Sequence, residues 1–281
     1  MTVRIVTDSS SCLPPGWAEE NGVSVIPQGI VVDGTAYREN VDLSGDEFYR
    51  LLEWGSTATS SQPRPDAFVT AYRAALDAGD EMVSVHIGSD LSGTLDAAYS
   101  HAAGLRTPDS PARIHLVDSC SAGLGLGFLV VEAARLAAEG AEALSIVTAL
   151  EAMVPKIRVY FMLHTMTYLV RGGRVGRAAG LAASLLKLRP ILTINDGEIA
   201  PAARTRTPHA AAAQLWALID ASARRGVRYA GFHYGLNRDE VDGWRQEFTR
   251  RYGLEAWLTQ LGPAVGAHSG PRVLGVVLVE E

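Results

Sequence analysis

The sequence predicts an α/β protein in which largely parallel sheets are flanked by helices. Short apolar runs alternate with helical patterns over most of the 281 residues, which is the element order typical of a parallel sheet. Hydrophobic residues make up 47% of the chain and charged residues 20%, so it can bury a core of ordinary globular size without disulfides. The length fits two modest domains or one large one.

The expected strands are short apolar runs bounded by turn residues. They cover Val3–Val6, Ser24–Val32, Met82–Ile87, Arg113–Val117, Val159–Leu163, Pro190–Ile194, Tyr229–His233, Ala256–Thr259 and Val273–Val279. The expected helices are segments in which apolar residues recur every three to four positions. They cover Asp46–Glu53, Asp66–Leu76, Gly127–Ala138, His209–Ala223 and Glu240–Arg251. Gly34, which follows Asp33 between two β-like runs, predicts a hairpin.

A change of composition near Pro155 predicts two lobes, residues 1–155 and 156–281. Loops before it are rich in hydroxyls, whereas Arg and Gly dominate the loops after it.

Charge, cysteine content and hydropathy exclude several classes of protein. With 25 Lys+Arg against 31 Asp+Glu the net charge is −6, which argues against a protein that coats nucleic acid. Cys12 and Cys120 are too few for a disulfide framework or a cysteine zinc site. The first residues lack a long apolar stretch, and Glu132 and Arg135 interrupt the most apolar segment. We therefore expect a cytoplasmic protein that is not an integral membrane protein.

Loops rich in hydroxyls follow several predicted strands and precede helices. They are RIVTDSSS at Arg4–Ser11, ATSSQPRP at Ala58–Pro65, VSVHIGSDLSGT at Val83–Thr94 and IHLVDSCSAG at Ile114–Gly123. In an open α/β sheet such loops converge on one crevice, toward which helix N–H groups point. Each hydroxyl could serve only as an N-cap, but the loops carry more hydroxyls than capping needs. They therefore favour an anion site.

Other chemistries have weaker support. Ser92 is a candidate nucleophile with His268 as its base, but the only similar motif, GAHSG at Gly266–Gly270, has histidine where a nucleophile elbow has serine. No metal-binding spacing surrounds Asp8 or Asp118, which we expect to hold the hydroxyl loops in place.

Nucleotide motifs are incomplete as well. The dinucleotide fingerprint G-x-G-x-x-G could begin at Gly123 or Gly125, with its second glycine at 125 or 127. Its last glycine would then fall at position 128 or 130, where the chain has Phe128 and Val130. The chain also contains no P-loop.

The segment YLVRGGRVGR at Tyr168–Arg177 places arginines among glycines. Glycine lets a partner approach the backbone, and arginine suits carboxylate or phosphate. An RNA-binding tract would need repeats and interleaved aromatics, which this segment lacks. His268 lies among small residues that leave room around its ring, and Arg204 is an isolated cation near a strand end.

Six ordered motifs resemble the DegV family over essentially the whole chain. They are TDSSS at Thr7–Ser11, SSQP at Ser60–Pro63, SDLSGT at Ser89–Thr94, VDS at Val117–Ser119, YLVRGGRVG at Tyr168–Gly176 and GPAVGAHSGP at Gly262–Pro271. The resemblance implies that residues 3–280 form one unit, a two-lobed α/β carrier with a ligand crevice between its lobes. The crevice would bind one long-chain fatty acid, such as palmitate. The resemblance further implies a separate fatty acid kinase that phosphorylates the bound carboxylate, so that the chain itself is not an enzyme and needs no cofactor.

The resemblance also implies roles for particular residues. Ser60, Ser92 and His268 would contact the carboxylate, with Gly93 and Thr94 beside Ser92. Arg204 would orient His268, and Arg171 and Arg174 would face the headgroup or the kinase.

The sequence departs from the family pattern at two places. TSSQP leaves open whether Thr59 or Ser60 supplies the hydroxyl, and Arg272 stands where the family usually has glycine. The alternative function is an acyl- or phosphoryl-transfer enzyme that uses Ser92 and His268. Transient contact with a membrane stays open, and binding of nucleic acid is not expected.

Overall fold

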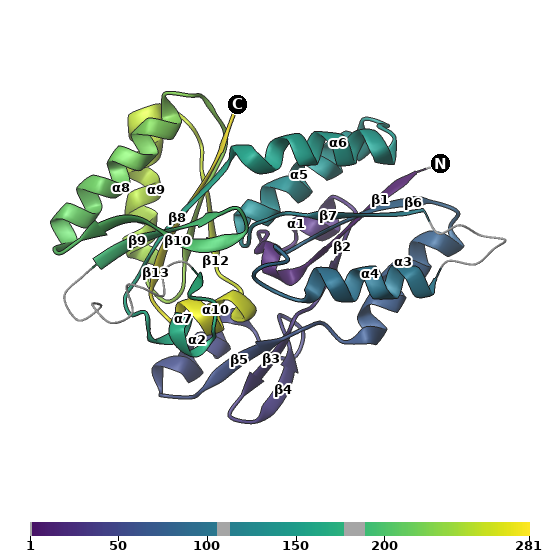
Figure 1. The fold of residues 1–281 in the computed structure, drawn as a ribbon, viewed down its shortest axis with the longest axis horizontal. Coiled ribbons are helices and arrows are strands. Elements are labelled where there is room, and N and C mark those ends of the chain that lie inside the picture. Colours follow the sequence, from purple (N-terminus) through teal and green to yellow (C-terminus); the bar gives the residue numbers. More distant parts are fainter. Residues whose placement is uncertain (1, 106–112, 177–188) are drawn as a thin grey trace.

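The computed structural model describes residues 2–105, 113–176 and 189–281, and it confirms an α/β fold (Figure 1). Three sheets make up the fold. A four-stranded sheet lies in the first half of the chain, a six-stranded sheet lies in the second half, and a small three-stranded sheet lies beside both.

The four-stranded sheet is entirely parallel. In spatial order its strands are β2 (Val23–Ile26), β1 (Val3–Asp8), β6 (Glu81–His86) and β7 (Ile114–Asp118). Helices α5 (Leu124–Ala138) and α6 (Ala143–Met153) cover one face, and α3 (Pro65–Asp77) and α4 (Thr94–Gly104) cover the other (Figure 1). Because strand side chains alternate, Ile5 packs on the α5 side and Val6 on the α3 side. Both faces are therefore buried, as in other parallel sheets.

The six-stranded sheet is mixed. Its strands in spatial order are β10 (Glu198–Thr205), β9 (Arg189–Asn195), β8 (Ile157–Leu163), β13 (Val273–Glu280), β11 (Val227–Tyr234) and β12 (Trp257–Gln260). Helices α8 (Pro208–Ala223) and α9 (Arg238–Tyr252) pack on one face, and α5 contacts β8 and β13. A single apolar cluster thus joins the two large sheets through α5.

Strand direction in this sheet differs from the expected, largely parallel arrangement. β11 and β12 pair in parallel, whereas the other neighbouring pairs are antiparallel. A tight turn at Asp196 and Gly197, both with positive φ, joins β9 to β10, and such a turn can connect only antiparallel strands.

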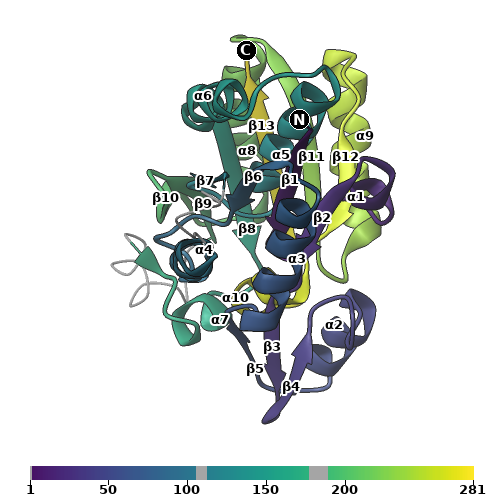
Figure 2. The ribbon, with the colours of Figure 1, turned by 90° about the vertical axis from the view of Figure 1, so that its right-hand side faces the viewer.

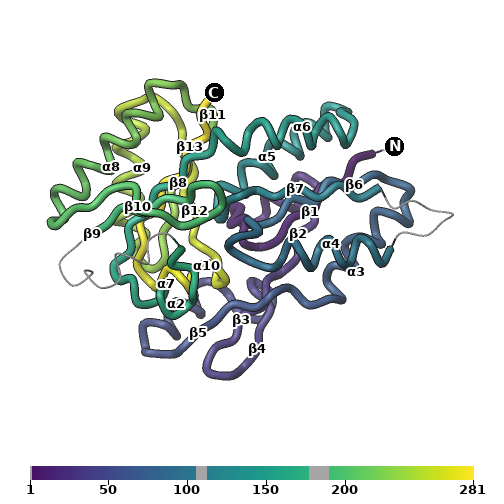
Figure 3. Tube along the Cα trace, in the orientation of Figure 1, coloured from purple at the N-terminus to yellow at the C-terminus, as the bar shows by residue number. Residues whose placement is uncertain are grey.

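The small sheet brings an early segment against the end of the chain. In spatial order its strands are β4 (Thr35–Arg38), β3 (Gly29–Val32) and β5 (Ala58–Ser61). Helices α2 (Gly45–Glu53) and α10 (Pro263–Ser269) share an apolar cluster with this sheet. Figures 2 and 3 show β3 and β5 beside the yellow α10. The predicted hairpin at Gly34 is confirmed, because Asp33 and Gly34 take φ values of 47° and 84° between β3 and β4.

Some elements were not foreseen correctly. The single strand expected over Ser24–Val32 is wrong, because β2 and β3 belong to different sheets and Pro27, which has no N–H, lies between them. The hydroxyl loop at Ala58–Pro65 begins as strand β5. The remaining short elements are η1 (Ser9–Ser11), α1 (Trp17–Glu20), η2 (Val154–Lys156) and α7 (Thr167–Arg171).

Pro155 lies in η2, immediately before β8. The division into lobes 1–155 and 156–281 stays a prediction. Within the described residues, no helix combines the length and apolarity that crossing a membrane requires.

Candidate functional site

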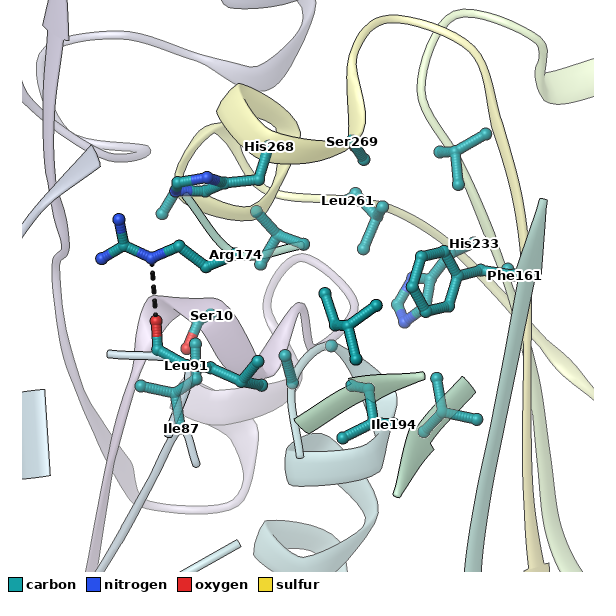
Figure 4. Close-up of a pocket in the computed structure, with 18 of the residues that line it drawn as sticks. Ser10, Ile87, Leu91, Phe161, Arg174, Ile194, His233, Leu261, His268 and Ser269 are labelled. Carbon is teal, nitrogen blue, oxygen red and sulfur yellow. Dashed lines mark hydrogen bonds between the residues drawn. The ribbon is translucent and has the colours of Figure 1, made fainter. Parts of the chain in front are cut away.

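A pocket lies between the carboxyl ends of the parallel strands, the small sheet, and strands β8 and β13 of the six-stranded sheet (Figure 4). It holds about 950 Å³ of empty space, counting the part that is open to solvent. Its polar lining residues are Ser10, Gln28, Ser60, Ser61, Ser92, Arg174, His233, His268 and Ser269. Its apolar side chains include Ile87, Leu91, Val159, Phe161, Leu163, Leu169, Ile194, Ile199, Leu261, Val265, Val273 and Val277. The wall is therefore mostly hydrocarbon, with a small number of polar groups.

The hydroxyl loops converge on this pocket, as predicted. Ser10, Ser60, Ser92 and Ala122 line it, and each comes from a different one of the four loops. The physical reason is the parallel sheet, which places the carboxyl ends of β1, β6 and β7 at one edge.

Many of the loop hydroxyls, however, serve the loops themselves. Oδ1 of Asp8 accepts from the backbone N–H and the hydroxyl of Ser10. Asp118 accepts from Ser89 Oγ at 2.6 Å and from the backbone N–H of Cys120 at 2.8 Å. The expectation that these aspartates hold the loops is confirmed. The surplus of hydroxyls is thus a weaker indication of a ligand than the convergence of the loops.

Ser60 and His268 form a direct pair and, together with the neighbouring Arg174, make up the polar end of the pocket. Ser60 Oγ lies 2.7 Å from Nε2 of His268 and comes from β5, while His268 lies near the end of α10. β5 and α10 pack together, so residues separated by most of the chain meet here. Thr59, the alternative hydroxyl, is exposed and is not among the lining residues.

His268 is held in its neutral form. Burial, together with the Arg174 guanidinium, lowers the pKa of its imidazole to about 4. Among the described residues its buried Nδ1 has no hydrogen-bond partner. Buried N–H groups without partners are rarer than unpartnered acceptors, which favours the tautomer whose proton is on Nε2. In that tautomer His268 donates to Ser60, and the Ser60 hydroxyl proton is free to point into the pocket.

Gly172 explains why the ring fits. A Cβ on Gly172 would lie 2.0 Å from Nδ1 of His268, so only glycine allows this approach. The glycine pair of the RGGR segment was expected to serve close approach to a partner. For Gly172 the group that approaches is the site histidine itself.

Ser92 approaches the pocket from the turn that begins α4. Its Oγ lies 2.9 Å from Thr94 Oγ1 and accepts from the Thr94 N–H, so it does not pair with His268. Thr94 is fully buried and bonds to Gln28 rather than lining the pocket. Gly93 precedes the helix and packs against the side chain of Gln62. The Ser92–His268 nucleophile and base of the alternative function are therefore not hydrogen-bonded to each other.

The predicted arginines occupy different places. Arg174 lines the pocket near His268, and its guanidinium donates to the backbone oxygens of Leu91 at 3.2 Å and Gly172 at 2.7 Å (Figure 4). Arg171 is exposed and lies 6.0 Å from the ring centre of Tyr168. Arg204 is exposed on β10 and is absent from the lining residues, so the structure does not bring it to the pocket. Arg174 takes the place beside His268 that was expected for Arg204.

His233 lies apart from this polar end (Figure 4). Gly275 of β13 pairs with His233 on one side and with Phe161 on the other. Nε2 of His233 accepts from the Leu124 N–H at 2.8 Å, and its Nδ1 lies 3.0 Å from Thr259 Oγ1. Burial lowers the pKa of His233 to about 4. Both ring nitrogens are hydrogen-bonded within the protein, so the His233 ring forms part of the pocket wall and has no free nitrogen with which to bind a ligand.

A second serine–histidine cluster lies in the core. His86 Nδ1 is 3.0 Å from Asp8 Oδ2, and His86 Nε2 is 2.8 Å from Ser84 Oγ. Tyr72 OH is 3.1 Å from the same serine. This order resembles a catalytic triad, but Ser84 and His86 have no exposure and none of these residues lines the pocket. The cluster can only be structural in this state.

Sequence reasoning did not find Gln28 and Ser61, which also line the pocket. Gln28 follows the proline between β2 and β3, and no motif singles it out. Ser61 lies next to Ser60 in a segment that was expected to be a loop. Among the described residues, no group of His, Cys, Asp and Glu is arranged to hold a metal ion.

Comparison with known proteins adds an independent line of evidence. The family model described as "Uncharacterised protein, DegV family" matches residues 2–281. A DegV domain-containing protein of Caldanaerobacter subterraneus is 32% identical over 284 residues, which cover 99% of each chain.

Solved structures show the same similarity. One, described as fatty acid binding of a DegV family protein from Thermus thermophilus, has a TM-score of 0.91 and 32% identity, with 100% of both chains covered. Another, described as DegV, a fatty acid binding protein from Bacillus subtilis, has a TM-score of 0.90 and 27% identity over 100% of both chains.

Proposed function

The chain belongs to the DegV family, and we propose that it binds one long-chain fatty acid in the pocket described above. The carboxylate would lie at Ser60, Ser92 and His268, and the hydrocarbon tail would lie along the apolar wall. The similar proteins from Thermus thermophilus and Bacillus subtilis, both described as binding fatty acids, support this proposal.

The observation that carries the proposal is the unequal distribution of polar groups in one cavity. Ser60 pairs with His268, and Arg174 lies near His268 and bonds to the backbone of Leu91, which precedes Ser92. The rest of the wall is largely aliphatic and aromatic. Burying methylenes at about 0.8 kcal/mol each would give a sixteen-carbon tail on the order of 10 kcal/mol before ordering costs. The tail would dominate the affinity, and the polar end would fix the orientation.

The polar end suits an anion that must stay reactive. In the tautomer whose proton is on Nε2, neutral His268 donates to Ser60, which leaves the Ser60 proton for a carboxylate oxygen. Neutral donors hold a carboxylate without an ion pair that would neutralise it. Arg174 is the one Lys or Arg among the described residues that line the pocket, and it is itself exposed and bonded to backbone oxygens.

The finer part of the proposal is presentation to a kinase. The polar end includes the exposed residues Ser61 and Arg174, so a carboxylate there would be close to the surface. A separate fatty acid kinase would transfer the terminal phosphoryl group of ATP to a carboxylate oxygen, giving an acyl phosphate and ADP. This chain would orient the acid, with palmitate as one suitable ligand and Arg171 facing the kinase. That role also places the protein in the cytoplasm.

Analysis of bound lipid tests fatty acid binding directly. We expect solvent extraction of the purified protein, followed by mass spectrometry, to release fatty acid, and the stripped protein to bind palmitate again. Ser92→Ala and His268→Ala should each weaken binding of palmitate by about tenfold. The first removes a hydrogen bond to the carboxylate, and the second removes the donor that leaves the Ser60 proton free for the carboxylate. Ser100→Ala, an exposed serine on α4, is the matched control. Absence of fatty acid before and after palmitate is supplied would contradict the proposal.

The kinase step has its own test. With palmitate, ATP and a fatty acid kinase, trapping by hydroxylamine should yield the hydroxamate of the acyl phosphate, and the yield should fall in Ser92→Ala and His268→Ala. Equal yields in both variants would remove this site assignment. An activated ester separates the alternative enzyme from a carrier, because a covalent adduct on Ser92 is expected only of the enzyme.

A further inference from the structure

A chain of hydrogen bonds connects the pocket to a buried carboxylate. Gln28 Nε2 donates to Asp8 Oδ1 and to Thr94 Oγ1, both at 3.1 Å. Thr94 Oγ1 lies 2.9 Å from Ser92 Oγ, which lines the pocket. Gln28 is thus the link between the core and the site, and it lines the pocket itself.

Asp8 gives this chain a fixed starting point. Its Oδ2 accepts from His86 Nδ1 and from the Ile87 N–H, and its Oδ1 accepts from Ser10 as well as from Gln28. Burial alone would raise the pKa of Asp8, but the bonds and charge of His86, with the bonds from Ser10 and Ile87, hold it below its usual value. Asp8 is therefore an ionised acceptor, and only the NH₂ group of Gln28 can face it.

The backbone holds Gln28 in place. Its N–H donates to Ser9 Oγ at 2.9 Å, and its carbonyl oxygen accepts from the Glu39 N–H at 2.9 Å. The residue is only 3% exposed, so its amide has little room to rotate. The side chain therefore presents a fixed donor to Thr94.

This donor sets the direction of the remaining bonds. Thr94 Oγ1 accepts from Gln28 Nε2, and its own proton can go to Ser92 Oγ at 2.9 Å or to Gln28 Oε1 at 3.3 Å. The shorter contact is with Ser92, and the bond to Oε1 would use the same amide a second time. When Thr94 donates to Ser92, the Ser92 proton is left to point into the pocket.

We infer that Gln28 is a positioning residue for the acid headgroup. Through Thr94, it directs the Ser92 hydroxyl proton toward the bound carboxylate. This inference rests on the proposed function, since it assumes that Ser92 contacts a carboxylate. Ser60 receives the same kind of support from His268. Each of the two site hydroxyls would accept a hydrogen bond from its neighbour, His268 or Thr94, and donate its own proton to the carboxylate.

A double-mutant cycle with palmitate as the ligand tests the inference. Gln28→Met keeps the length of the side chain and removes both N–H donors, so we expect the dissociation constant for palmitate to rise about tenfold. In the Ser92→Ala background the same change should alter the constant by less than about twofold. Thr94→Val breaks the chain at its next link and should show the same pattern, and it provides the test if Gln28→Met does not fold.

The outcomes separate this inference from the proposed function. If the wild-type protein binds palmitate and Gln28→Met or Thr94→Val weakens binding equally with and without Ser92, the positioning role is overturned. If both variants bind as tightly as the wild type, it is overturned as well. If the wild-type protein itself binds no palmitate, the proposed function fails and the inference fails with it. Coupling to Ser92 in both variants supports it.

Discussion

Within the part of the chain that the structure describes, two clusters combine serine with histidine, and one of these two lies on a cavity. The core cluster consists of Asp8, Tyr72, Ser84 and His86, and the pocket cluster consists of Ser60, Ser92 and His268. Both ring nitrogens of His86 are hydrogen-bonded, whereas His268 Nδ1 has no partner among the described residues.

The difference shows what makes a cluster a candidate binding site. The residue types are nearly the same, and the core cluster even has the better triad geometry. What distinguishes the pocket cluster is that Ser60, Ser92 and His268 line an open cavity, and that His268 Nδ1 has no partner among the described residues. The core cluster is fully satisfied by its own members and neighbours, so its expected contribution is to stability.

The largest expected effect comes from the core cluster. His86→Leu removes a donor from the buried Asp8 carboxylate and should lower the free energy of unfolding by about 3 kcal/mol. Unfolding in urea measures this change. His268→Leu is the matched variant in the pocket cluster and should cost about 1 kcal/mol while weakening binding of palmitate. Equal losses of stability in the two variants would contradict the assignment of a structural role to the core cluster and a binding role to the pocket cluster.

His233 tests an intermediate case, since it lines the pocket but is fully hydrogen-bonded. Burial lowers its pKa from 6.5 to about 4, so between these values the unfolded chain binds a proton that the folded protein does not. Stability from this group is present above about pH 6.5 and is lost as the pH falls toward 4, by at most about 1.4 kcal/mol per pH unit.

His233→Gln removes the titration and should flatten that slope of unfolding free energy against pH. Glu39 acts in the opposite direction, because burial raises its pKa from 4.5 to about 7 and its stabilisation is lost as the pH rises through that window. Both proteins contain Glu39, so its contribution cancels when the unfolding free energy of the variant is subtracted from that of the wild type at each pH. Parallel pH curves for the two proteins would show that His233 does not titrate as proposed.

A smaller effect is expected from Gly172→Ala, which lies against His268 of the pocket cluster. The added methyl group would overlap Nδ1 of His268 and push the ring away from Ser60, so affinity for palmitate should fall about tenfold. Titration calorimetry measures the affinity. Gly243→Ala in α9, where a Cβ meets nothing within 4 Å, is the control and should bind normally. Normal binding by Gly172→Ala would mean that the position of the His268 ring does not matter.

The sequence predicted more of the site than of its surroundings. Ser60, Ser92, Arg174 and His268 were identified from motifs, and the structure brings all of them to one pocket. Arg204 was placed beside His268 by resemblance, but it lies exposed on β10. Gln28 carries no sequence signal, because its role depends on Asp8 and Thr94, which come from other elements.

Local chemistry explains what the sequence by itself determined. Apolar periodicity defined the main strands and several helices, the Asp33–Gly34 pair defined a hairpin, and the hydroxyl loops marked the carboxyl ends of parallel strands. These features depend on neighbouring residues, which the sequence displays directly.

Tertiary structure alone decided which polar atoms are used up and which remain free. Asp8 and His86 satisfy each other across β1 and β6, while Ser60 meets His268 only because β5 packs against α10. Whether a hydroxyl proton is available to a ligand depends on partners far away in the chain. The sequence named the hydroxyls, and the packing of the sheets determined which of them face the cavity.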